Sequence, residues 1–282
     1  MTRLLAEMQT SIMTTALPLM DGNVERFGIY VLILRQSLRG SDAGTPVLSV
    51  SSSLGLPFET TRRHVQSLIA MGLCRRIAGG IVATDHWRDD GEIQELCELA
   101  HDCFVRFIAD LQAVEPLSLQ GRPSTVYDWT AGLQTAIDLM LSVAETNRNA
   151  HRDWLDLVLF STLLCANHRA TADGSFADAA VPLRAIKVAE LARALSLAGS
   201  TVQRRIAGMH AAGIVENRRD GIVVSPEWLA NDLAHDTTAA TQVNMRRVLA
   251  TLEAKGFPFV DPPLAYRRGR PPAAAMGLRL TL

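Results

Sequence analysis

Arginines in adjacent pairs are the residues of this chain best suited to bind a ligand. Four such pairs lie in two short regions, together with glutamines and small hydroxyl residues: Thr60, Arg62, Arg63, Gln66, Arg75 and Arg76 in the first, and Ser200, Thr201, Gln203, Arg204, Arg205, Arg218 and Arg219 in the second. A guanidinium group donates paired hydrogen bonds to phosphate or to a guanine edge, and glutamine pairs with adenine. Short hydroxyl groups suit a phosphate backbone. These residue types predict contacts with a polyanion rather than catalysis.

Helical spacing surrounds both arginine-rich regions. Thr61, Val65 and Leu68 form one apolar face, and we expect them to pack inward with the arginines on the opposite side. Val202, Ile206 and Met209 do the same in the second region. A shorter amphipathic helix precedes each one. A glycine suited to a helix C-cap, Gly72 or Gly213, follows each arginine-rich helix. Two short apolar strands separated by a polar turn come next.

The two regions are copies of one pattern. Leu54 aligns with Leu195, and the register then holds without a gap at an offset of 141 residues (213 − 72, 221 − 80 and 228 − 87), which pairs glycine with glycine twice and tryptophan with tryptophan. Helical stretches at 4–19 and 24–38 have counterparts at 126–145 and 151–168. We therefore predict one module at 1–118, a second at 119–260 and a disordered basic tail rich in proline and alanine at 261–282.

Residues 47–84 and 186–225 resemble the winged helix-turn-helix superfamily of bacterial DNA-binding regulators, in two tandem copies. The resemblance implies a mainly α fold with small β-hairpin wings and flanking helices. It also implies sequence-specific binding of double-stranded DNA and transcriptional regulation, with the residues named above as the contacts. In the tail, Arg268-Gly269-Arg270-Pro271 resembles the core of an AT-hook, which adds Arg268 and Arg270 to the expected DNA contacts.

Charge is distributed as this interpretation requires. The formal net charge is only -1. Residues 59–76 nevertheless hold four arginines against one glutamate, and residues 193–219 hold five against one. Residues 85–115 are acidic, and we expect the helix that they form to face away from DNA. Basic charge is therefore concentrated in the two arginine-rich regions.

Other function classes find little support in the sequence. No P-loop, glycine-rich dinucleotide turn or paired-carboxylate motif is present, so we expect no enzyme, no cofactor and no metal. The four cysteines form no CxxC pair and are expected to be reduced and mostly buried, and Cys97 with His101 is expected to serve packing. With no apolar stretch near 20 residues and no signal peptide, we expect a cytoplasmic protein that does not contact a membrane.

Two alternatives stay open from the sequence. A plasmid-type replication initiator also uses two winged helices, and an assembly or adaptor protein would use its winged helices to bind protein. Homodimerisation through the helical segments and a small-molecule effector are compatible with the sequence, which identifies no effector.

Overall fold

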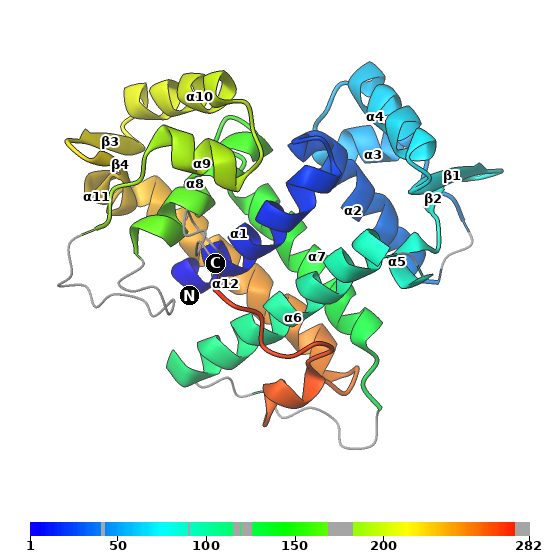
Figure 1. The fold of residues 1–282 in the computed structure, drawn as a ribbon. Helices are drawn as coiled ribbons and strands as arrows, with labels where there is room; N and C mark the ends of the chain where they lie inside the picture. Colours follow the sequence, from blue (N-terminus) through cyan, green and yellow to red (C-terminus); the bar gives the residue numbers. More distant parts are fainter. Residues whose placement is uncertain (41–42, 90, 115–118, 120–125, 169–182, 274–282) are drawn as a thin grey trace, which may run out of the picture.

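The computed structural model describes residues 1–40, 43–89, 91–114, 119, 126–168 and 183–273. The protein is mainly helical with two small antiparallel hairpins, as the sequence predicted (Figure 1). The first half contains α1 (Thr2–Leu19), α2 (Val24–Leu38), α3 (Val47–Leu54), α4 (Phe58–Ala70), β1 (Cys74–Ile77), β2 (Gly80–Ala83), α5 (His86–Asp89) and α6 (Gly91–Val114). The second half contains α7 (Trp129–Thr146), α8 (Trp154–Asn167), α9 (Val188–Ala194), α10 (Gly199–Ala211), β3 (Val215–Arg218), β4 (Gly221–Val224), α11 (Pro226–Leu229), α12 (Asp232–Glu253) and the 3₁₀ helix η1 (Pro262–Ala265).

Residues 45–83 and 186–224, which we call the first and second compact units, have the same order of elements. Each unit has a short helix, a tight turn, a longer helix and a hairpin, and α4 and α10 begin at positions 141 residues apart (199 − 58). The tight turns contain a left-handed residue at equivalent positions, Gly55 at φ 65° and Ser196 at φ 52°. Glycine adopts this conformation without strain.

Both longer helices end as the sequence predicted. Gly72 and Gly213 have positive φ, and the next residue donates its backbone N–H to a carbonyl of the last helical turn, from Leu73 to Leu68 and from Ile214 to Met209. These bonds close a Schellman-type cap, which satisfies carbonyls that the helix end would otherwise leave unpaired. Each cap turns the chain directly into its hairpin.

The hairpins are held by one further backbone bridge each. β1 pairs with β2 so that Arg76 lies opposite Ile81, and β3 pairs with β4 so that Asn217 lies opposite Ile222. The residue two positions before the short helix adds a third antiparallel partner, Thr45 to Ile81 and Ile186 to Ile222. A two-stranded hairpin alone is marginally stable. The extra bridge and the packing of the strands against α2 and α8 hold each hairpin in place.

The longer helices of the two halves share one core. α1 packs against α6 and α8, and α7 packs against α12, α6 and α2, so each half is supported by helices of the other. Phe27 on α2 contacts Trp154 on α8, and Gly28 lies so close that a Cβ there would overlap the Trp154 ring. The predicted module boundary between residues 118 and 119 lies within the stretch 115–125, of which only Leu119 is described. Residues 171–180, whose alanine, aspartate and glycine content predicts a connecting loop, also lie outside the described residues.

The expectation of a disordered tail from residue 261 is wrong for residues 261–273. This segment contains η1 and continues along α6, whereas residues 274–282 lie outside the described part. Phe257 and Phe259, which precede it, are fully buried, and Phe257 contacts Phe104 on α6. The apolar anchor explains why a proline-rich basic segment is fixed in place.

Candidate nucleic-acid interface

Helix α4 has two chemically different faces. Thr61, Val65 and Leu68 are fully buried, which confirms the predicted inward face. Arg62, Arg63 and Gln66 lie exposed on the other side. Arg62 is paired with Glu59, one turn earlier, at 2.8 Å. Arg63 forms no ion pair with a described residue, so its guanidinium is available to an external anion.

Helix α10 has the same organisation. Val202, Ile206 and Met209 are buried, as predicted, and Gln203 and Arg204 are exposed. Arg204 occupies the position of Arg63 in the aligned register and likewise forms no ion pair within the described part of the chain. The hydroxyl residues near the two helix starts are accessible: Thr60 and Thr201 are half-buried and Ser200 is exposed.

Arg205 differs from its predicted role. Its guanidinium donates to Asp153 at 2.6 Å and to Asp156 at 3.1 Å, both at the start of α8, and its side chain is only 17% exposed. His64 occupies the aligned position on α4, where it contacts Glu25 at the start of α2 at 3.3 Å. In both units this position fixes the longer helix to its supporting helix. We therefore interpret Arg205 as a positioning residue rather than a DNA contact.

The hairpin arginines are exposed, as an interface requires, but their positions differ from those expected. Arg75 and Arg76 lie within β1 rather than in the turn, and Arg218 ends β3, so only Arg219 lies in a turn. All four side chains are exposed. No ion pair joins any of the four to another described residue, so they are available to an external anion.

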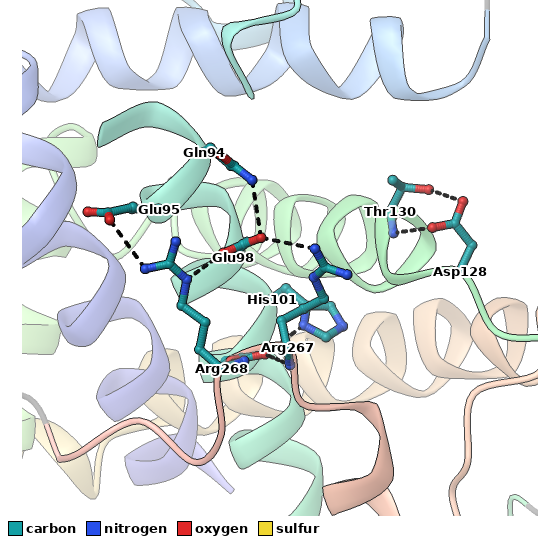
Figure 2. A network of polar contacts seen from close by, with 9 residues as sticks. Gln94, Glu95, Glu98, His101, Asp128, Thr130, Arg267 and Arg268 are labelled. Carbon is teal, nitrogen blue, oxygen red and sulfur yellow. Dashed lines mark hydrogen bonds and ion pairs between the residues drawn. The ribbon is translucent and has the colours of Figure 1, made fainter. Parts of the chain in front are cut away.

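The tail arginines are held by acidic residues of α6. Arg268 pairs with Glu98 at 2.5 Å and with Glu95 at 3.3 Å, and Arg267 pairs with Glu98 at 3.0 Å (Figure 2). Arg270 pairs with Asp110 at 2.5 Å. The AT-hook-like segment is thus paired within the protein, and Arg268 and Arg270 would have to exchange these carboxylates for phosphates to act as the expected DNA contacts. Burial would raise the pKa of Glu98, but the hydrogen bonds from Arg268 and Arg267 outweigh it and lower that pKa.

Asp102 is a key residue of this acidic helix, next to His101 in a pair that the sequence led us to expect at the helix surface or in structural hydrogen bonds. Its carboxylate accepts the backbone N–H groups of Arg267 and Arg268 at 2.9 and 2.8 Å and contacts Nδ1 of the fully buried His101. The other ring nitrogen of His101 contacts the Tyr127 hydroxyl at 2.9 Å. This agrees with the expectation that His101 has a structural role. Glu95, Glu98 and Asp102 share one helical face by their spacing, which is the sequence signal that was available.

Metal-ligand clusters are absent from the described residues: no three histidine, cysteine, aspartate or glutamate side chains converge there. All four cysteines are free and buried, as expected. Burial raises the thiol pKa of Cys97 to about 12, so this thiol stays protonated. No described helix combines the length and the apolar composition needed to cross a membrane.

His151 makes stability depend on pH. Its ring packs against Phe160 and Trp228, and burial lowers its pKa to about 4. Since the pKa of an unfolded histidine is ~6.5, unfolding takes up a proton between these values, so stability is complete above pH ~6.5 and lost as pH falls toward ~4. We expect His151 to lower the free energy of unfolding by about 2 kcal/mol when the pH falls from about 7.5 to about 5. Urea denaturation of His151→Phe should show a shallower pH dependence by that amount.

The matched control for this measurement is His235→Phe, because His235 is exposed on α12. Its pH dependence should equal that of the unmodified protein. If His151→Phe keeps the full pH dependence, the histidine is not held neutral by burial.

Helices α4 and α10 lie on one side of the molecule. In Figure 1, α4 and α10 both lie at the top of the view, with the hairpins at the two outer flanks.

A comparison with protein families, with curated proteins and with solved structures finds no match for this chain. The function must therefore be inferred from the geometry of the chain itself.

Proposed function

We propose that the protein binds double-stranded DNA sequence-specifically through α4 and α10 and regulates transcription, and that the two compact units are tandem winged helix-turn-helix modules. The observation that carries the proposal is the recurrence of one two-sided helix. In both units the inner face is buried, and the same register position carries an exposed arginine that has no ion-pair partner among the described residues, Arg63 or Arg204.

The chemistry of these faces suits a DNA major groove. The groove admits an α-helix, whose side chains then read base edges, and arginine and glutamine are the common readers of guanine and adenine. On α4 these groups are Arg63 and Gln66, which lie one helical turn apart. On α10 they are the adjacent residues Gln203 and Arg204. The exposed hairpin arginines are suited to phosphates beside the groove.

The arrangement of the two units supports a two-part target. Since α4 and α10 lie on the same side of the protein (Figure 1), one duplex along that side would meet both helices. Half-sites contacted by such a pair are separated by about 10 base pairs or a multiple of that distance. The helices differ at Arg62 against Gln203, so the two half-sites need not be identical.

The decisive experiment selects duplexes from a randomised library at two salt concentrations, using the full chain and an Arg63→Ala, Arg204→Ala variant. We expect a two-part motif whose binding weakens about 100-fold in the variant, because each arginine contact is worth about 1–3 kcal/mol. The dependence on salt should also become less steep. The matched control is Arg88→Ala, Arg247→Ala, which removes two exposed arginines from α5 and α12 and should bind the selected duplex nearly as well as the unmodified chain.

Absence of an enriched motif, or equal losses in the two double variants, would contradict the proposal. An adaptor protein that binds protein partners would give no enrichment at all. A replication initiator would enrich a motif but would act at an origin, so dependence of plasmid replication on the protein, without control of a promoter, would replace the regulatory part of the proposal.

A further inference from the structure

A pocket of about 540 Å³ lies between the two compact units. Its walls come from α2, the end of α7, the α7–α8 connection, the start of α8, the α3–α4 turn and one residue of α10, Arg205. Small-molecule sites occupy about 300–1,000 Å³, and they commonly lie where two structural units meet. The pocket therefore has the size and the place of a ligand site.

The pocket combines an apolar lining with buried polar atoms that lack a partner. Leu32, Leu141 and Leu155 line it together with the Trp154 indole. His151, another lining residue, is 5% exposed, and neither of its ring nitrogens has a hydrogen-bond partner among the described residues. The buried Nε1 of Trp154 is likewise without a partner there. Such atoms normally find a partner. They are enclosed behind the pocket wall, so the pocket itself offers a ligand the apolar lining and the guanidinium groups rather than these nitrogens.

The donors at this pocket favour an anion. The lining contains four arginines, Arg35, Arg148, Arg152 and Arg205. Arg35 is paired with Asp138, Arg148 with Glu145, and Arg205 with Asp153. The fourth, Arg152, is exposed and makes no ion pair to any described carboxylate. A guanidinium in that state is suited to a carboxylate or sulfonate.

Residues of the pocket also hold the two DNA-facing helices in place. Asp153 pairs with Arg205 of α10, and Glu25 contacts His64 of α4. Arg148 donates to the backbone carbonyl of Ser53, beside the α3–α4 turn. An anion at this place competes with Asp153 for Arg205, and so weakens the attachment of α10 to α8.

We propose that this pocket binds an amphipathic organic anion, with an apolar ring or chain and one acidic group, and that binding lowers the affinity for DNA. The second part of this proposal, the effect on DNA affinity, which we call the regulatory clause, rests on the proposed function. The first part, anion binding, which we call the binding clause, concerns the pocket alone and does not rest on it.

Calorimetry with naphthoate as the probe tests the binding clause without DNA. We expect saturable binding of one molecule per chain, at least tenfold weaker binding of the neutral naphthalenemethanol, and still weaker binding of the cationic naphthylmethylamine. Arg152→Gln should weaken naphthoate binding about tenfold, and Trp154→Phe should weaken it as well. Arg88→Gln, at an exposed arginine of α5 outside the pocket, should leave it unchanged.

No saturable naphthoate binding, equal affinity for the three probes, or an unchanged affinity in Arg152→Gln overturns the site. Saturating naphthoate should then lower the affinity for the selected duplex about tenfold, and an unchanged affinity overturns the regulatory clause. If naphthoate binds as described while no duplex is enriched, the pocket stands and the proposed DNA-binding function fails.

Discussion

Replacing Asp102 by alanine is expected to lower the free energy of unfolding by about 4 kcal/mol. The carboxylate is 3% exposed and accepts two backbone N–H groups of the tail while it orients His101. Its loss leaves two partly buried donors and the buried His101 without this acceptor, and a buried donor left unpaired costs ~1–3 kcal/mol. Urea denaturation measures the loss. Faster trypsin cleavage after Arg267 or Arg268 should accompany it, because the tail is then no longer fixed to α6.

Glu95→Ala is the matched control on the same helix. Glu95 also pairs with Arg268, at 3.3 Å, but its side chain is 60% exposed. Exposed ion pairs contribute about 0–1 kcal/mol, so this variant should stay close to the unmodified protein. Equal stabilities of Asp102→Ala and Glu95→Ala would show that the tail is not docked on α6.

Local features of the fold followed from the sequence because they depend on nearby residues. A glycine after an amphipathic helix predicts a C-cap, and Gly72 and Gly213 both form one. The inward positions Val65 and Ile206 followed from helical spacing. The offset between the two compact units was visible because no insertion interrupts the register.

Contacts distant in sequence account for what could not be predicted. The partner of Asp102 lies 165 residues away, and charge alone does not tell whether a basic tail binds an acidic helix or an external anion. Arg205 was expected on the outer face because it adjoins Arg204. A helix has flanks as well as two faces, and only the position of α8 decides that this flank meets Asp153.

The pocket illustrates the same limit. Its lining comes from α2, α3, α7, α8 and α10, and its residues show no shared spacing or motif in the sequence. The sequence does not mark His151 or Trp154 as pocket residues, and only the packing shows which of their polar atoms lack partners among the described residues. Sequence reasoning therefore reached the helix faces of the candidate interface, but it did not reach the site between the units.

Gly80→Ala and Gly221→Ala are expected to destabilise the protein by about 4 kcal/mol each, through the same mechanism in the two hairpins. Gly80 has φ 141° and Gly221 has φ 151°, a region that other residues rarely adopt. A Cβ would lie 2.4 Å from the carbonyl oxygen of Thr45 in the first case and 2.6 Å from that of Ile186 in the second. These oxygens belong to the bridges that hold the hairpins, so relieving the overlap breaks the bridge hydrogen bonds.

Gly213→Ala separates backbone strain from this overlap. Gly213 also has positive φ, at 72°, but no atom lies within 4 Å of the added Cβ, so we expect a loss of about 1 kcal/mol. Urea denaturation compares the three variants, and hydrogen exchange should show each hairpin variant losing protection in its own hairpin first. A loss below about 1 kcal/mol at Gly80 or Gly221 would contradict the bridge in that unit.

If the hairpins also contact phosphates, both variants should bind the selected duplex more weakly although every arginine is retained, because the flanking arginines are then no longer held in place.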